Sequence, residues 1–147
     1  MIRFFGGRVM TLANGIETQD IEVWTEGSKI VFVGKPKAEE LDGKVFEREY
    51  DLKGNLLMPS FKNAHTHSAM TFLRSYADDM PLQDWLFKQI FPMEAKLDGE
   101  KVYWLTKLAI LEYLTTGCTA AFDMYFELDD YVKACIESGF RSVLCGA

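Results

Sequence analysis

The chain has 147 residues, of which 48% are hydrophobic and 26% are charged, a composition typical of a folded globular protein and not of a disordered or fibrous one. Its 22 acidic and 16 basic residues give a formal net charge of -6, and the Lys and Arg residues form no cluster or helical stripe, so we expect no nucleic-acid partner. No basic segment leads into a long apolar run, and no stretch reaches the roughly 18 apolar residues of a membrane helix, so we expect no membrane partner and a cytoplasmic location.

Residues 1–58 contain several short apolar segments separated by turn residues, a pattern typical of β-strands. Residues 21–24 and 29–33 flank a short connection that contains Gly27, and they predict an antiparallel hairpin. The other apolar segments are 2–12, 45–52 and 55–58. We therefore expect a small β layer at the start of the chain.

From residue 59 onward the spacing of apolar residues becomes helical. A first predicted helix carries its apolar stripe on Leu82, Trp85, Leu86 and Ile90. Asp79 and Pro81 precede this stripe and can cap and begin a helix. A longer predicted helix begins after Asp98, a good N-cap, and ends at Thr116, where Gly117 can adopt the left-handed conformation.

A predicted strand over residues 119–124 follows, then a helix that ends at Gly139 and a strand over residues 141–145. We expect the inward stripe of this third helix on Leu128, Tyr131, Val132 and Cys135. Apolar strands that alternate with amphipathic helices predict a parallel sheet covered by helices, either an open doubly wound sheet or a barrel. Because a full (β/α)8 barrel takes roughly 250 residues, residues 59–147 would supply about three of its eight units.

The three cysteines, Cys118, Cys135 and Cys145, show no CxxC spacing. Each has apolar neighbours, and free cysteine usually packs as a small apolar side chain. We therefore expect three buried, reduced thiols, and a redox or zinc-thiolate role is the weaker alternative.

The only two histidines of the chain, His65 and His67, stand two positions apart at the end of an apolar segment. In a strand, residues i and i+2 face the same side, so both imidazoles can converge on one metal ion. Imidazole suits Zn²⁺ or Fe²⁺, and catalytic sites usually take about three protein ligands plus water. The spacing alone favours the alternative, a chance pair on a polar strand end.

The setting of this pair favours the metal interpretation. Residues 59–67 (PSFKNAHTH) resemble the first barrel strand of the amidohydrolase superfamily, in particular the 5-methylthioadenosine/S-adenosylhomocysteine deaminases and the triazine chlorohydrolases. The resemblance extends to residues 69–74 (AMTFLR), 77–79 (ADD), 81–86 (PLQDWL), 92–95 (PMEA), 116–117 (TG) and 122–126 (FDMYF). It implies an α/β fold with an N-terminal β-sandwich segment over residues 1–58, followed over residues 59–147 by the first β/α units of a metal-dependent (β/α)8 TIM barrel, truncated.

The resemblance also implies a metal centre. In that family the histidine pair, a later His and a later Asp hold one divalent metal, which activates a water that attacks an electron-poor aromatic carbon. His65 and His67 are the implied metal ligands here, zinc is the expected metal and iron the alternative. The parent protein would deaminate a purine-like or other amino-substituted heterocycle, a small-molecule substrate, and the alternatives on the same scaffold are a chlorohydrolase and a guanine deaminase.

Two further residues are implied as substrate-binding. Glu94 matches the family glutamate that reaches the ribose hydroxyls, and a carboxylate suits two adjacent hydroxyl donors; the alternative is a solvated charge at a helix end. Trp85 can supply a flat aromatic wall for a base, although core packing explains it equally well. Asp123 ends a predicted strand, and we favour a structural, hydrogen-bonded role for it. Arg74, Asp78 and Asp79 are expected to hold their loop in shape or to line the entrance of the site, and to carry no chemistry.

The chain departs from the family pattern in one decisive respect: it has no third histidine, and the later Asp and the proton-shuttling Glu have no counterparts. We therefore place no catalytic residue within this chain and expect it to be inactive alone, as the N-terminal portion of a longer enzyme. Its partner would be the remainder of its own barrel or a second copy in a homo-oligomer. A split enzyme and a noncatalytic metal-binding or assembly module are the alternatives. Residues 145–147 (CGA) stand where many nucleoside deaminases carry an arginine, which leaves the exact substrate open.

Overall fold

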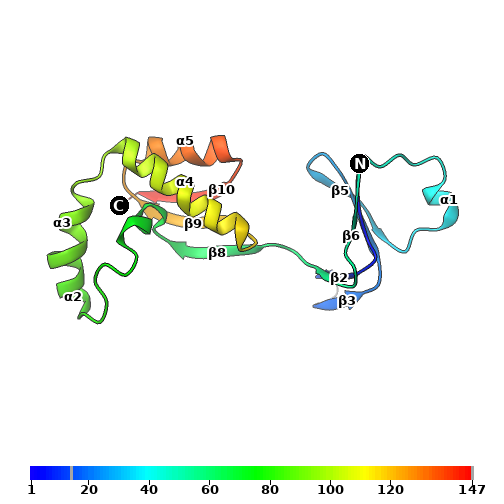
Figure 1. Ribbon diagram of the computed structural model, residues 1–147, viewed down its shortest axis with the longest axis horizontal. Coiled ribbons are helices and arrows are strands. Elements are labelled where there is room, and N and C mark those ends of the chain that lie inside the picture. The colour runs from blue at the N-terminus through cyan, green and yellow to red at the C-terminus, as the bar shows by residue number, and fades with distance from the viewer. Residues whose placement is uncertain (14, 147) are drawn as a thin grey trace. The chain divides into compact units, whose positions relative to one another are not determined.

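The computed structural model describes residues 1–13 and 15–146. The chain divides into two compact units, Met1–Pro59 and Ser60–Ala147, each with its own sheets (Figure 1). Within the described ranges, no helix is both long enough and apolar enough to cross a membrane.

The Met1–Pro59 unit is built from two small sheets. A four-stranded sheet has the order β5-β4-β1-β6, and a three-stranded sheet has the order β3-β2-β7. Their elements are β1 (Ile2–Phe5), β2 (Arg8–Thr11), β3 (Glu17–Gln19), β4 (Glu22–Glu26), β5 (Lys29–Gly34), α1 (Ala38–Leu41), β6 (Arg48–Asp51) and β7 (Leu56–Leu57). The predicted hairpin is confirmed, because β4 and β5 pair antiparallel around Gly27, whose φ is 56°.

Three features of this unit were not predicted: the division of segment 2–12 into two strands, strand β3 and helix α1. The apolar segment 2–12 is two strands of different sheets, because the chain turns at Gly6, where φ is 69°. The next residue, Gly7, has no room for a side chain: a Cβ there would lie 2.4 Å from the Asn55 carbonyl oxygen. Strand β3 and the short helix α1 carry mostly polar residues, so neither has the apolar pattern on which the prediction depended.

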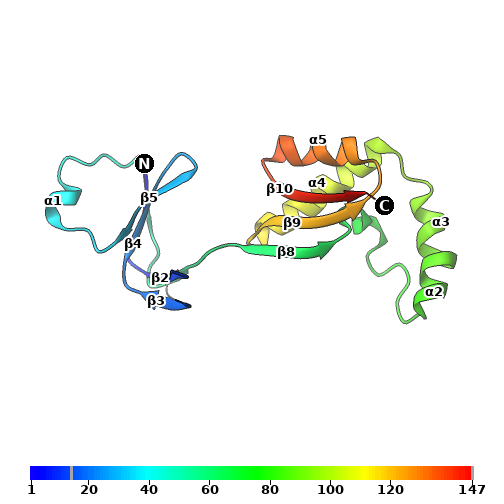
Figure 2. The ribbon, with the colours of Figure 1, turned by 180° about the vertical axis from the view of Figure 1, so that it is seen from behind.

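The Ser60–Ala147 unit contains a parallel sheet, as predicted. Strands β8 (Phe61–Thr66), β9 (Cys118–Tyr125) and β10 (Arg141–Gly146) lie in the order β8, β9, β10 and pair in parallel. The connecting helices α4 (Gly99–Thr115) and α5 (Leu128–Ser138) cover the same face of this sheet (Figures 1 and 2). Strands added in one direction with helices on one face are the arrangement of a barrel segment, whereas a doubly wound sheet covers both faces.

Helices α4 and α5 have the predicted ends. The Asp98 side chain accepts a hydrogen bond from the Lys101 backbone N–H at 3.0 Å, and Gly117 (φ 82°) follows the C-terminus of α4. Gly139 (φ 63°) ends α5. The predicted inward stripe of α5 is partly wrong: Tyr131 and Cys135 are buried, but Leu128 and Val132 are each 37% exposed, and Ala134 takes their place in the interior. Val102 and Ile110 of α4 complete this core.

The helix predicted around residues 82–90 is real but irregular. It consists of α2 (Leu82–Asp84), a π-helical segment η2 (Trp85–Ile90) and α3 (Phe91–Glu94), and it follows the 3₁₀ helix η1 (Ser68–Leu73). Pro92 has no N–H to donate to the carbonyl four residues earlier, so a regular α-helical ladder cannot pass through it. The capping prediction was wrong, because the N-cap residue is Pro81, which makes no side-chain hydrogen bond, and not Asp79.

The face of the sheet away from α4 and α5 carries exposed apolar side chains, among them Phe122, Met124 and Val143. Cys145 lies next to Met124 in the neighbouring strand and is exposed, so the prediction of three buried thiols was wrong at this position. Cys118 and Cys135 are buried and unbonded, as expected. The sequence context of Cys145 is apolar, but no described residue covers that face of β10.

Candidate metal centre

The two histidines lie side by side at the carboxyl end of strand β8. His65 belongs to the strand and His67 follows it, and their ring centroids are 5.0 Å apart with an interplanar angle of 84°. His65 is exposed and His67 is half-buried. The structure thus brings together the predicted metal ligands, in the i, i+2 arrangement that a strand imposes.

A backbone carbonyl fixes the orientation of one imidazole. Nδ1 of His67 lies 2.9 Å from the Met124 carbonyl oxygen on the neighbouring strand β9. Because a carbonyl oxygen only accepts, Nδ1 carries the proton, and in the neutral ring Nε2 keeps its lone pair. Metal-binding histidines are commonly oriented by such a bond from the nitrogen that does not touch the metal. The His67 ring therefore presents Nε2 as the nitrogen with an available lone pair.

The described part of the chain supplies only part of a ligand set. It holds no group of three or more His, Cys, Asp or Glu side chains that could bind a metal ion. Catalytic zinc usually takes about three protein ligands plus a water. The histidine pair would fill two of these positions, and a complete ligand set would need further residues from outside the described ones.

A cavity of about 320 Å³ lies beside His67 and brings together the predicted substrate-binding residues. Trp85 and Glu94, both half-buried, line it with His67. The remaining lining residues are mostly apolar: Met70, Leu86, Ile90, Phe91, Met124, Tyr125 and Phe126. A small cavity with apolar walls and a few polar groups is typical of a small-molecule site.

The π-helical segment explains how Trp85 and Glu94 reach the same cavity. They are nine residues apart, which is about two and a half turns of an ideal α-helix and would place them on opposite sides. The π segment between them turns less per residue because its hydrogen bonds span five residues instead of four. The π segment therefore reduces the angle between the two side chains, both of which line the cavity, and such segments are frequent at functional sites.

Tyr125 is a cavity residue that the sequence did not reveal. It is only 3% exposed, yet within the described residues its hydroxyl makes no hydrogen bond. Burial, and then the nearby charge of Glu94, raises the pKa of this hydroxyl. The available signal was its position at the carboxyl end of the parallel strand β9, the end at which barrel enzymes place their chemistry.

Asp123 has the structural role that the sequence favoured. Its side chain is fully buried, and it accepts hydrogen bonds from the Ser68 backbone N–H at 3.2 Å and from the Tyr131 hydroxyl at 2.8 Å. The Ser68 hydroxyl also donates to it. Burial raises the pKa of the Tyr131 hydroxyl, so this group stays a proton donor. Asp123 therefore ties strand β9 to the residue that follows His67.

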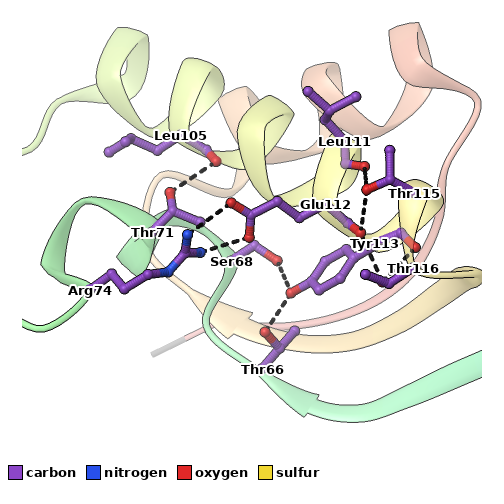
Figure 3. A network of polar contacts seen from close by, with 10 residues as sticks. All are labelled: Thr66, Ser68, Thr71, Arg74, Leu105, Leu111, Glu112, Tyr113, Thr115 and Thr116. Atoms are coloured by element: carbon purple, nitrogen blue, oxygen red, sulfur yellow. Dashed lines mark hydrogen bonds and ion pairs between the residues drawn. The ribbon is translucent and has the colours of Figure 1, made fainter.

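Arg74 holds its loop in shape, as expected. Its guanidinium donates to both carboxylate oxygens of Glu112 on α4, at 2.7 and 3.0 Å (Figure 3). The pair raises the pKa of Arg74 and lowers that of Glu112. Both side chains are largely exposed, so the contribution of the pair to stability is small.

The chain is similar to known proteins. Residues 56–147 match the model of the amidohydrolase family. The 5-methylthioadenosine/S-adenosylhomocysteine deaminase of Desulfitobacterium hafniense is 44% identical over 123 residues, which is 84% of this chain and 28% of the relative. The 5'-deoxyadenosine deaminase of Methanospirillum hungatei is 56% identical over 94 residues, 64% of this chain and 21% of the relative.

Solved structures are similar as well. An adenosine deaminase from Xanthomonas campestris with bound zinc matches with a TM-score of 0.89 and 33% identity, over 97% of this chain and 33% of that protein. The atrazine chlorohydrolase of Arthrobacter aurescens in complex with zinc matches with a TM-score of 0.85 over 99% of this chain and 35% of that protein, but at 22% identity it supports the fold alone.

The relatives are much longer than this chain, which spans 28% of the Desulfitobacterium deaminase. The resemblance seen in the histidine segment and its flanks is nevertheless confirmed, because the family model covers the whole parallel sheet and the residues around the cavity. The chain belongs to the amidohydrolase family.

Proposed function

We propose that this chain is the N-terminal portion of a cytoplasmic, metal-dependent hydrolase that deaminates a purine-like or other amino-substituted heterocycle. Residues 1–58 would form its β-sandwich segment and residues 59–147 the first units of its TIM barrel. The observation that carries the proposal is the cavity of about 320 Å³ in which Trp85, Glu94 and His67 meet, with His65 beside it.

His65 and His67 would hold the metal. The His67 Nδ1 bond to the Met124 carbonyl leaves Nε2 as the ligand atom, and zinc is the expected ion because the Xanthomonas deaminase contains it, with iron as the alternative. A divalent metal in such a site lowers the pKa of water toward about 7 and so supplies a nucleophile at neutral pH.

The cavity residues would bind and orient the substrate. The Trp85 indole offers a flat surface on which a heterocyclic base packs. The Glu94 carboxylate accepts hydrogen bonds from hydroxyl groups of an attached sugar, and the apolar walls exclude water around them. His67 lines the same cavity, so a base held against Trp85 lies within the same small space as the proposed metal ligand.

The remaining ligands and the proton-transfer groups would come from the rest of the barrel. Strands β8 and β10 are the edges of the parallel sheet among the described residues, and the apolar side chains Phe122 and Val143 are exposed on its open face. Unpaired edges and exposed apolar faces favour association. The partner would be the remaining barrel strands or, as the alternative, a second copy in a homo-oligomer.

Deamination is favoured over dechlorination. Relatives with 44% and 56% identity are deaminases of adenosine derivatives, whereas the chlorohydrolase is 22% identical. The carboxylate of Glu94 in the cavity also suits a hydroxyl-bearing substrate better than a triazine.

Two measurements test the proposal. The first is zinc titration of the enzyme that joins this chain to the remaining barrel strands: we expect binding that is lost in His65→Ala and His67→Ala and kept in Lys62→Ala, an exposed control on the same strand. No histidine-dependent binding would eliminate the metal centre.

The second measurement is ammonia release by the enzyme that joins this chain to the remaining barrel strands, with adenosine derivatives, guanine and chlorotriazines as substrates. We expect release from adenosine derivatives that stops when a chelator removes the metal. Binding of zinc without turnover of any of these compounds would point to the noncatalytic module instead.

A further inference from the structure

A chain of hydrogen bonds runs behind the two histidines. The Thr66 hydroxyl lies 2.5 Å from the Tyr113 hydroxyl, which lies 3.0 Å from the Ser68 hydroxyl (Figure 3). Ser68 in turn donates to the buried Asp123. Three of these residues come from elements far apart in the sequence: Ser68 from the turn after β8, Tyr113 from α4 and Asp123 from β9.

The direction of each bond follows from the carboxylate at its end. The Ser68 hydroxyl donates to a carboxylate oxygen of Asp123, so its single proton is used in that bond. The Ser68 oxygen must then accept from Tyr113, and the Tyr113 oxygen must accept from Thr66. All three hydroxyl groups therefore donate toward Asp123, an arrangement in which neighbouring hydrogen bonds strengthen one another.

This chain of hydrogen bonds contains the two residues that alternate with His65 and His67 along the backbone. Thr66 and Ser68 flank His67, and both side chains face Tyr113. Because successive side chains of extended backbone point to opposite sides, fixing these two side chains toward α4 turns His65 and His67 toward the other side. His67, with φ -135° and ψ 76°, lies where the chain passes from β8 into the 3₁₀ helix that begins at Ser68.

The Asp123 end of this chain of hydrogen bonds is buried. Ser68 and Asp123 are 2% and 0% exposed, and Tyr113 stacks on Phe140 with ring centroids 5.5 Å apart. A buried carboxylate is costly unless its hydrogen bonds are satisfied, and here the Ser68 and Tyr131 donors satisfy them. Any rotation of the turn after β8 would break at least one of these bonds.

We infer that Tyr113, Ser68 and Asp123 are positioning residues for the two imidazoles, and that the Tyr113 hydroxyl sets the geometry of the metal-binding pair from a helix that does not touch it. The inference rests on the proposed metal centre. The inference goes beyond that metal centre because it assigns a positioning role to residues on the side of the sheet that faces α4.

Tyr113→Phe tests the inference, with Tyr103→Phe as the matched control. Tyr103 lies on the same helix and donates to Glu137, so the control removes the same atom from α4 without touching β8. We expect the zinc dissociation constant, measured by competition with a chromophoric chelator, to rise about three- to tenfold for Tyr113→Phe, since outer partners of metal ligands contribute on this scale or above it. Tyr103→Phe should change it less than twofold.

Ser68→Ala is the second variant, with Ser60→Ala at the opposite end of β8 as its control. It cuts the link to Asp123, so we expect a loss of zinc affinity at least as large as that of Tyr113→Phe. The double variant should lose no more zinc affinity than Ser68→Ala alone, because both substitutions break the same chain of hydrogen bonds. Circular dichroism on each variant verifies that the fold is kept.

A metal-free readout separates this inference from the metal centre itself. Nitrogen NMR of the histidine rings reports the tautomer, and we expect His67 to be the Nδ1–H form in the native protein and a mixture in Ser68→Ala and Tyr113→Phe. Unchanged tautomer and unchanged zinc affinity in folded variants would overturn the inference while leaving the metal centre standing. If the native enzyme, with this chain joined to the remaining barrel strands, binds no zinc but shows the tautomer shift in the variants, the metal centre is overturned and the positioning role is supported.

Discussion

Two helical segments of the Ser60–Ala147 unit differ in how they are built. Helix α4 is regular over its 17 residues, is capped by Asp98 and buries Val102, Ala109 and Ile110 along one face. The segment 82–94 has no side-chain cap, contains a π-helical stretch and buries only Ile90. The regular helix supports the sheet, and the irregular one presents Trp85 and Glu94 to the cavity. The irregular segment thus lies where side chains line the cavity, and the regular helix lies where side chains pack in the core.

The largest expected effect comes from breaking the packed helix. Ile110 is 2% exposed in the core, and Ile110→Ala should cost roughly 2–4 kcal/mol of unfolding free energy, because it removes buried apolar surface and leaves a cavity. Leu111→Ala is the matched control, since Leu111 is 59% exposed on the same helix. Urea unfolding followed by circular dichroism measures both. Equal losses in the two variants would mean that the buried face of α4 does not hold the unit together.

The sequence predicted α4 well because its signals are local. An N-cap, a helical apolar stripe and a glycine after the last turn all lie within one segment, as do the signals that end α5 at Gly139. The spacing of His65 and His67 likewise predicted their proximity, because the period of a strand is fixed by backbone geometry.

Other features depend on contacts that no local pattern encodes. The bond between Thr66 and Tyr113 joins residues 47 positions apart, and that between Ser68 and Asp123 joins residues 55 apart. Cys145 has apolar neighbours in sequence, yet its exposure depends on what covers β10. The π segment was missed because Leu82, Trp85, Leu86 and Ile90 fit a regular helix, and only the effect of Pro92 on the ladder distinguishes the two.

Pro92→Ala should weaken the irregular segment's function without the stability loss expected for Ile110→Ala. Alanine restores an N–H and lets the helix continue in regular form, which would turn Glu94 away from Trp85. We expect the KM for adenosine to rise about tenfold in the enzyme that joins this chain to its remaining strands, or about 1.4 kcal/mol of binding. Amide hydrogen exchange over residues 82–94 should slow at the same time.

Pro81→Ala is the control for this change, because Pro81 is the N-cap and precedes the irregular stretch. Its KM should stay within twofold of the native value. A Pro92→Ala variant that keeps both native KM and native exchange rates would show that the π segment does not depend on this proline.

The smallest expected effect concerns the cap of α4 and its dependence on pH. The side chain and the backbone N–H of Lys101 lower the pKa of Asp98 below its ordinary value of 3.8. A lowered pKa means that the carboxylate stabilises the folded state fully above pH 3.8, and that this contribution is lost as the pH falls through the lower folded value. Asp98→Asn keeps a capping oxygen but cannot titrate, so the acid-induced loss of helicity at 222 nm should be smaller than in the native chain. Asp98→Ala should begin with less helicity at neutral pH, because it removes the cap itself. If all three proteins lost helicity along the same pH curve, the ends of α4 would contribute nothing to its regularity, and its difference from the segment 82–94 would come from core packing alone.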